Sequence, residues 1–288
     1  MNLALRARLL VRVPVALRQV SSVAKRRAAA PARILMFHGT PRRHAAELEW
    51  QLRYLRRRFE VVPLGEQAAR RGTIALTFDD GLRSNVEVAY PILRRLRLPA
   101  TFFVCPALID ERRWLWTHEA RARLRALGAD PEAIERLVQR MKGMDLPARR
   151  AVEERLRDET PDYRPCAEER EAHELAGWDE LARLDPALVA IGSHTHTHPI
   201  LTTLTREEAK SEICGSREVL EKRLGRPVEL FCYPNGAVDS TALELARRSY
   251  RLAVTASPGG VQPNFDPLLL PRLAAPRGLL RLAWRISS

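Results

Sequence analysis

Short apolar runs alternate with amphipathic stretches along most of the chain. Runs rich in β-branched or aromatic residues, each ending in a turn or a polar cluster, span 33–39, 73–81, 100–106, 188–195, 229–236, 251–260 and 268–273. Helical periodicity marks stretches between them, such as 47–59 and 205–225, and the second of these begins with Thr205 and Glu208 at capping-box spacing. Strands that alternate with helices predict a parallel sheet covered by helices.

The number of strand candidates favours a barrel over an open, doubly wound sheet. Neither a GxGxxG nor a Walker A sequence is present, so the sequence gives no positive support for a nucleotide-binding sheet. In barrels of parallel strands, chemistry gathers at the C-terminal ends of the strands, which is where the polar clusters of this chain fall. The predicted class is therefore α/β, with a distorted parallel (β/α)7 barrel.

The regular alternation is interrupted at 108–175, which is long, highly charged and mostly helix-like. We interpret this stretch as a helical insertion that either covers the site as a lid or is a solvated elaboration of one loop. The expected organisation is a basic apolar segment at 1–32, the barrel at 33–275 and a C-terminal tail at 276–288. Four prolines punctuate the insertion: Pro131, Pro147, Pro161 and Pro165.

The total net charge overstates how basic most of the chain is. The net charge is +13, but the first 33 residues hold eight Lys or Arg and no acid, which leaves 40 basic against 35 acidic groups in the remainder. Interspersed signs are typical of a solvated surface, so a nucleic-acid partner is not predicted. A nucleic-acid binder would instead show a steep dependence of binding on salt.

The N-terminal segment is not predicted to be an export signal, because arginines interrupt every apolar run before it reaches the length of a signal core. We expect a cytoplasmic chain whose basic, apolar ends either contact the inner face of an anionic membrane or form frayed tails. No CxxC pair occurs, so all cysteines are expected to be reduced, as is usual in the cytosol. These cysteines are Cys105, Cys166, Cys214 and Cys232.

Candidate chemistry begins with Asp79, Asp80 and Gly81, which directly follow an apolar strand. Alone, this pattern usually marks a turn with a helix cap. Adjacent carboxylates also suit a divided task, in which one binds a metal and its neighbour accepts a proton from the water that the metal activates.

Three of the seven histidines stand within five residues: His194, His196 and His198. His194 and His198 are four apart, so one turn of chain can present both rings to one cation while His196 points elsewhere. Two histidines and one carboxylate form a normal catalytic zinc shell with a position left open for water. The cluster therefore favours a metal site over a purely structural role.

The motif "TFDDG" and the motif "SHTHTHP" together resemble the polysaccharide deacetylases of carbohydrate esterase family 4, which share the NodB homology domain. The resemblance extends over most of the chain, from about residue 34 to about residue 273. It implies a NodB-type distorted barrel that removes acetyl groups from N-acetylated sugars. It also implies that Asp79 is the general base and that Asp80, His194 and His198 are the metal ligands.

The third motif departs from the common RxPYG pattern, in which the arginine orients the base. This chain has "FCYPNG", which places Phe231 where that arginine would fall and is similar to a branch with FxYPxG. The resemblance to that branch implies that the backbone N–H of Tyr233 stabilises the oxyanion. It also implies that Arg272 pairs with Asp79; the alternative for Arg272 is an ordinary surface salt bridge.

The family's C-terminal Leu-x-His motif is absent, because no histidine follows His198. In a branch of exopolysaccharide deacetylases the corresponding strand is permuted to the front of the domain. "ILMFHG" fits that position, which implies that His38 is the general acid; the alternative is an ordinary strand-end histidine.

The implied function is a metal-dependent hydrolase that removes the N-acetyl group from an N-acetylated sugar or glycan and releases acetate. Zn²⁺ is favoured, and Co²⁺, Ni²⁺ or Mn²⁺ suit the same shell. A lipid-linked or nucleotide-linked sugar, or a glycan intermediate in envelope or exopolysaccharide assembly, suits a cytoplasmic or membrane-surface location. Two alternatives stay open: an amidohydrolase that acts on a non-carbohydrate amide, and a catalytically inactive sugar-binding relative.

Overall fold

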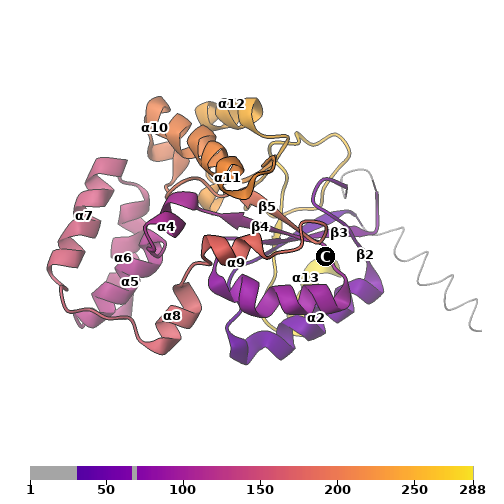
Figure 1. Ribbon diagram of the computed structural model, residues 1–288, viewed down its shortest axis with the longest axis horizontal. Helices are drawn as coiled ribbons and strands as arrows, with labels where there is room; N and C mark the ends of the chain where they lie inside the picture. Colours follow the sequence, from indigo (N-terminus) through magenta and orange to yellow (C-terminus); the bar gives the residue numbers. More distant parts are fainter. Residues whose placement is uncertain (1–30, 67–69, 288) are drawn as a thin grey trace, which may run out of the picture.

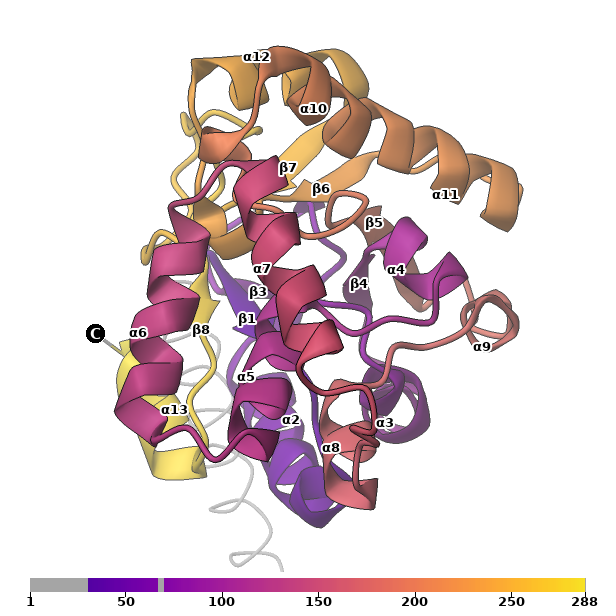
Figure 2. The ribbon, with the colours of Figure 1, turned by 90° about the vertical axis from the view of Figure 1, so that its left-hand side faces the viewer.

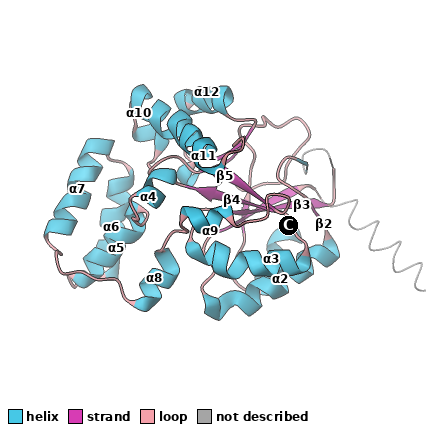
Figure 3. Ribbon diagram, viewed as in Figure 1, coloured by secondary structure: helices cyan, strands magenta, loops and turns pink. Residues whose placement is uncertain are grey.

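A curled, all-parallel sheet forms the centre of the protein (Figures 1 and 3). The structure is a computed structural model and describes residues 31–66 and 70–287. In sheet order, the strands are β7 (Leu252–Val254), β6 (Leu230–Cys232), β5 (Val189–Ser193), β4 (Ala100–Val104), β3 (Thr73–Phe78), β1 (Arg33–Phe37) and β8 (Leu273–Ala274). The short strand β2 (Glu60–Val61), which the sequence pattern did not predict, pairs with the start of β3.

The last predicted strand brings the two ends of the sheet together. Leu270 forms a bridge with Val254 at the end of β7, and Leu273, three residues later, pairs with Leu35 of β1. One short segment therefore contacts both edges of the sheet. The sheet curls into a distorted half-barrel with surrounding helices, which confirms the predicted α/β fold of NodB type.

Helices cover the outside of the sheet and bury its outward-facing side chains. They are α2 (Ala45–Arg58), α3 (Tyr90–Leu96), α9 (Trp178–Ala182), α10 (Arg206–Lys210), α11 (Ser216–Leu224), α12 (Ser240–Ser249) and α13 (Leu279–Ser287). A π-helical turn at Asn85–Ala89 precedes α3, and another at Ser211–Gly215 joins α10 to α11. Single 3-10 turns lie at Arg42–His44, Leu201–Thr203 and Pro234–Gly236. The main core between sheet and helices includes Leu52, Leu55, Leu76, Phe78 and Phe102.

The capping box predicted from spacing is present at the start of α10. The amide of Thr205 donates to Glu208 Oε2 at 2.8 Å, and the amide of Glu208 donates to Thr205 Oγ1 at 3.3 Å. The two residues therefore satisfy amide groups that a helix start leaves without partners.

Helices also fill the predicted insertion after β4, before α9. They are α4 (Pro106–Asp110), α5 (Trp116–Ala126), α6 (Pro131–Lys142), α7 (Leu146–Asp158) and α8 (Ala167–His173). Figure 2 shows α5, α6 and α7 as a group in front of the sheet. Asp130 and Asp145 cap α6 and α7 with their side chains, and a proline lies in the first turn of each helix. The group has its own small core, formed by Trp116, Ala120, Leu124, Ile134, Val138, Met141 and Leu156.

The structure describes nearly all of the C-terminal stretch but little of the N-terminal segment. The stretch 276–288, expected to be a tail, contains α13, whose Leu282 and Ile286 are buried in the main core. The predicted N-terminal segment 1–32 lies almost entirely outside the described residues. No helix in the described ranges combines the length and the apolar character that a membrane crossing requires. All four cysteines are free thiols.

Candidate active site

Polar side chains converge at the C-terminal edge of the sheet, where successive parallel strands end. Asp79 and Asp80 follow β3, His194 follows β5, and Arg272 directly precedes β8. His198 reaches the same place from the loop after β5. All five side chains are buried.

Asp80, His194 and His198 have the geometry of a ligand set for one cation. Asp80 Oδ1 lies 3.6 Å from His194 Nε2 and 3.6 Å from His198 Nε2. Three donor atoms about 2.1 Å from a tetrahedral zinc lie roughly 3.4 Å from each other, so the separations fit a shared metal better than direct hydrogen bonds. One oxygen and two imidazole nitrogens are also the donors that zinc prefers.

The protonation state of His194 suits a ligand. Its Nδ1 lies 2.8 Å from the carbonyl of Cys232, so Nδ1 carries the proton and Nε2 presents a lone pair. Burial lowers the pKa of both His194 and His198, which keeps the rings neutral. Burial raises the pKa of Asp80, and a bound cation would oppose that effect by favouring the carboxylate.

A second group of close donors, Asp79, His194 and Cys232, fits a metal less well. Both Asp79 oxygens already accept hydrogen bonds from Arg272. Burial raises the pKa of the Cys232 thiol well above its ordinary value, so the thiolate that a metal needs is disfavoured. The donor chemistry therefore favours the set that contains Asp80.

Asp79 forms a buried, two-pronged ion pair with Arg272. Both carboxylate oxygens accept from the guanidinium at 2.7 Å, and the Arg272 side chain is 1% exposed. Burial alone would raise the pKa of Asp79, but the charge and hydrogen bonds of Arg272 outweigh it and hold that pKa well below its usual value. The pair is therefore a buried contact and not the surface salt bridge that was the alternative.

The remaining donors of Arg272 are also satisfied. Its Nε donates to the carbonyl of Thr255 at 2.8 Å, and its Nη1 donates to Thr77 Oγ1 at 3.0 Å. Nη2 also contacts Cys232 Sγ at 3.0 Å. Because contacts from three strands fix the guanidinium, the orientation of the Asp79 carboxylate is fixed as well.

Three site residues have backbone angles in the left-handed region, which non-glycine residues seldom occupy. The φ angles are 73° at Asp80, 67° at Thr195 and 58° at His198. Such conformations cost free energy and concentrate at functional sites. Gly81 continues the turn with φ 67°, and a Cβ there would lie 3.1 Å from Val104 Cβ, so this position requires glycine.

Glu212, in the π-helical turn after α10, holds the histidine loop and was missed by sequence reasoning. Its Oε2 accepts the amides of His196 and Thr197 at 2.8 and 2.9 Å, and its Oε1 accepts Thr197 Oγ1 at 2.6 Å. The ring of His196 packs against Gly215 and is not part of the candidate ligand set, in keeping with the expectation that it points elsewhere. Because Glu212 sits in an ordinary charged helical stretch, no local sequence signal distinguishes it.

Trp116, the first residue of α5, connects the insertion to the same loop. Its indole N–H donates to the carbonyl of His198 at 2.9 Å, and the side chain is 2% exposed. The backbone amide of His198 donates to Thr195 Oγ1 at 3.0 Å. Both backbone groups of this candidate ligand are therefore fixed, one by the loop itself and one by the insertion.

Two further histidines of the insertion, His118 and His173, lie in contact with ring centroids 4.3 Å apart and ring planes tilted by 35°. Burial, reinforced by the neighbouring His173, lowers the pKa of His118 to about 3, and burial also lowers the pKa of His173. The segment that follows His173 returns to the site through a bridge between Leu175 and Leu82. The pair is therefore neutral at physiological pH.

His38 stands apart from the buried residues. It follows β1 and is exposed, at a cavity of about 240 Å³ that His44 and Gln51 also line. When His38 is protonated, its charge lowers the pKa of Asp79 and of Asp80. His38 is thus exposed, and the wall of its cavity includes none of the five buried side chains.

The structure shows the surroundings of the third motif. The amide of Tyr233 donates to the carbonyl of Val254 at 3.1 Å, because the ladder between β6 and β7 continues one residue beyond the strand; this amide is not a free donor. Phe231 is fully buried and stacks on Tyr250 at 4.8 Å, away from Asp79. Side chains alternate along a strand, so Cys232 is the one that faces Asp79.

Comparisons with known proteins identify a family and a fold. The family model described as polysaccharide deacetylase matches residues 66–250. The Bacillus subtilis protein YxkH is 21% identical over 207 residues, which are 72% of this chain and 52% of YxkH, so the chain spans about half the length of this relative.

Solved structures show the same fold. The Streptococcus pyogenes deacetylase PplD, in complex with acetate, matches with a TM-score of 0.62 and 17% identity, over 90% of this chain and 98% of that one. IcaB from Ammonifex degensii matches with a TM-score of 0.60 and 18% identity, with the same two coverages of 90% and 98%. At these identities the likeness is one of fold.

Proposed function

Because the chain belongs to the polysaccharide deacetylase family, we propose that it hydrolyses the amide of an N-acetylated sugar or glycan and releases acetate. The observation that carries this proposal is the pairing of two carboxylates with different tasks. Asp79 is held by Arg272 and stays ionised, while its neighbour Asp80 faces two neutral imidazoles. This is the arrangement that water activation beside a metal requires.

Asp80, His194 and His198 would hold the divalent cation. We propose Zn²⁺ first, since the donors are one oxygen and two nitrogens, with Co²⁺, Ni²⁺ or Mn²⁺ as alternatives. When bound, the ion supplies Lewis acidity toward the acetyl carbonyl and lowers the pKa of water.

Side chains of the protein itself accept and donate the protons of the reaction. Asp79 accepts the proton of the attacking water at a carboxylate oxygen, and Arg272 keeps that carboxylate in place. Water oxygen adds to the acetyl carbon, the C–N bond breaks, and His38 donates a proton to the departing amine. The Tyr233 amide serves the oxyanion only if its hydrogen bond to Val254 opens.

Acetate release tests the proposal. Protein stripped by chelation and protein reconstituted with zinc are compared on N-acetylglucosamine oligomers and on UDP-linked N-acetyl sugars. We expect acetate release only with metal. In His194→Ala, we expect both acetate release and stoichiometric zinc binding to be lost. Stoichiometric zinc without any acetate would contradict the sugar substrate and favour another amide, whereas no metal binding would contradict the site.

Contact with a membrane surface is a separate proposal, carried by α13. Leu280 and Trp284 are 86% and 72% exposed, one helical turn apart, and Arg281 is exposed beside Leu280. A basic helix with exposed apolar side chains suits the anionic inner face of a membrane, where a lipid-linked sugar would be met. Co-sedimentation with anionic vesicles, but not with neutral ones, should be lost in Leu280→Ser.

A further inference from the structure

A cavity of about 270 Å³ lies between the insertion and the histidine loop; we call it the insertion pocket. Its wall includes Trp116, which donates to the carbonyl of His198, and Thr197, the residue before that candidate ligand. Arg113, Arg149 and Arg157 also line it. The pocket therefore borders the candidate metal site through residues that are adjacent to His198 or bonded to it.

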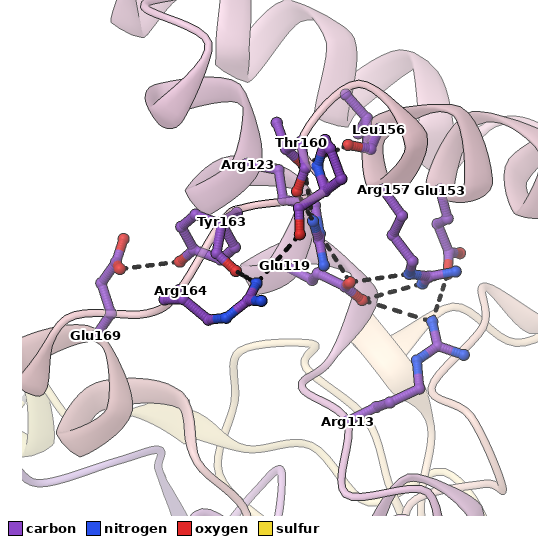
Figure 4. Close-up of polar contacts among 11 residues, drawn as sticks. Arg113, Glu119, Arg123, Glu153, Leu156, Arg157, Thr160, Tyr163, Arg164 and Glu169 are labelled. Carbon is purple, nitrogen blue, oxygen red and sulfur yellow. Dashed lines mark hydrogen bonds and ion pairs between the residues drawn. The ribbon is translucent and has the colours of Figure 1, made fainter.

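Guanidiniums outnumber the carboxylates they share at this place. Figure 4 shows Arg113 and Arg157 converging on the same two acids. Glu153 Oε2 accepts from Nη2 of both arginines at 3.1 Å. Glu119 accepts from Arg157 at 2.9 and 3.0 Å and also from Arg123 at 2.9 Å. With Arg149, four guanidiniums share two largely buried carboxylates.

Arg149 is the least satisfied member of this group. It is 5% exposed, its Nη1 has no hydrogen-bond partner among the described residues, and its Nε lies 3.4 Å from Glu153 Oε1. That Glu153 oxygen also accepts no hydrogen bond from the part of the chain that the structure describes. The guanidinium carbon lies over the Trp116 ring, 4.9 Å from its centroid, in a cation–π contact. A buried guanidinium with an unused N–H is costly and calls for an acceptor.

The rim does not remove this positive excess. Glu111, Glu154 and Arg150 are exposed at the rim, and Glu111 reaches Arg113 Nη1 at 3.1 Å. The whole lining still carries four arginines against three glutamates. In the inner part of the insertion pocket, around Arg149, the lining carboxylate is that of Glu153.

We propose that the insertion pocket binds an oxyanion of the phosphate class, with Arg149 as its central donor and Arg113 and Arg157 beside it. Planar guanidinium forks match the oxygens of phosphate in pairs, and a volume of about 270 Å³ is several times the roughly 30 Å³ that one water occupies. Arg113 precedes α5 whereas Arg149 and Arg157 belong to α7, so donors approach from different elements.

The position next to His198 indicates where the oxyanion comes from. If the acetyl group lies at Asp80, a charged group on the same sugar reaches past Thr197 into the pocket. We therefore assign the oxyanion to a phosphate carried by the acetylated sugar. This second step rests on the proposed function, whereas the binding site itself does not.

Calorimetry on chelated, full-length protein tests the site without any turnover. Inorganic phosphate and pyrophosphate are titrated at low ionic strength into the wild type, Arg149→Gln and Arg113→Gln. Arg136→Gln, on the exposed face of α6, is the matched control. We expect one equivalent to bind to the wild type and to the control, and binding about 10- to 100-fold weaker in both pocket variants.

Absence of binding to the wild type, or equal binding to all four proteins, would overturn the site. Circular dichroism shows whether Arg149→Gln is folded. Arg113 is the second probe because its side chain is 35% exposed and its loss is better tolerated. Since no metal and no turnover are involved, failure here does not touch the proposed deacetylation.

Turnover by zinc-loaded protein then distinguishes a phosphate carried by the acetylated sugar from a free phosphate. An acetamido sugar with a phosphate and the same sugar without one are compared as substrates. A sugar-borne phosphate predicts a lower KM for the charged substrate than for the neutral sugar in the wild type. It also predicts a KM for the charged substrate about 10- to 100-fold higher in Arg149→Gln, so that the preference over the neutral sugar is lost. An equal KM for the two sugars in the wild type would overturn the substrate assignment.

Discussion

The barrel and the insertion hold polar groups in opposite ways. In the barrel, the charged side chains stand at the ends of hydrogen-bonded strands, and each guanidinium donor of Arg272 has an acceptor. In the insertion, arginines share too few carboxylates around a small apolar core, and Arg149 keeps an unused donor. A satisfied network fixes geometry, whereas an unsatisfied one is suited to a ligand that arrives from outside.

The two regions meet at one backbone group. Trp116 of the insertion donates to the carbonyl of His198, while Glu212 of the barrel holds the two residues before it. The difference implies a division of tasks in which barrel residues carry the reaction and insertion residues select the substrate and brace the loop. The following substitutions test that division, beginning with the largest expected effect.

Asp79→Asn should have the largest effect, because it removes the proposed base and leaves Arg272 buried without its anion. We expect kcat to fall about 100- to 10,000-fold and the free energy of unfolding to fall by about 3–5 kcal/mol. Acetate release and denaturant melts measure the two quantities, with Asp162→Asn as the exposed control. Retention of most of the turnover with zinc bound would exclude Asp79 as the base.

Glu212→Ala should weaken the metal site without touching a ligand. Three hydrogen bonds to the histidine loop are lost, so we expect about 10- to 100-fold lower zinc affinity, the range typical of partners that orient ligands. Competition with a chelating dye measures the affinity. Glu212→Gln should restore part of it, and Glu207→Ala, exposed on α10, should have no effect. Unchanged affinity in Glu212→Ala would show that the loop is rigid by itself.

The strands and the local motifs of the site were predictable because their signals are local. Each apolar run ends where a strand ends, so the pattern places Asp79, Asp80 and His194 at one edge of the sheet. The partner of Asp79, in contrast, is 193 residues away, and only the resemblance pointed to Arg272. Alternation along β6 was available from the sequence and would have placed Cys232 toward Asp79.

The contribution of the insertion was not predictable, because it depends on how helices pack in space. Trp116 resembles any apolar residue at a helix start, and its hydrogen bond to His198 spans 82 residues. Glu212 is one of many charged residues in amphipathic helices, and only its burial distinguishes it. The numbers of acidic and basic residues along α7 also do not reveal that Arg149 is buried. Nor do they reveal that its Nη1 donor has no partner among the described residues.

Trp116→Phe probes the contact between the two regions more gently. It keeps an aromatic ring for Arg149 but removes the indole N–H, so a buried carbonyl of His198 loses its partner. We expect the free energy of unfolding to fall by about 1–3 kcal/mol and zinc affinity to fall by less than in Glu212→Ala. Trp50→Phe, on the exposed side of α2, is the control. Zinc affinity lower than in Glu212→Ala would make the insertion, not the barrel, the main support of the loop.

The two neighbouring histidines of the insertion, His118 and His173, should give the smallest effect, a change in how stability depends on pH. Below about pH 6.5 an unfolded chain protonates both rings, whereas the folded chain keeps His118 neutral down to its pKa of about 3. The free energy of unfolding therefore falls as pH falls from about 6.5, by at most about 1.4 kcal/mol per pH unit for each ring. His118→Gln should reduce this slope between pH 6 and 4 by up to about 1.4 kcal/mol per pH unit, the contribution of one proton, in denaturant melts of metal-free protein. An unaltered slope would mean that His118 takes up its proton without unfolding, so that the insertion opens while the barrel stays folded.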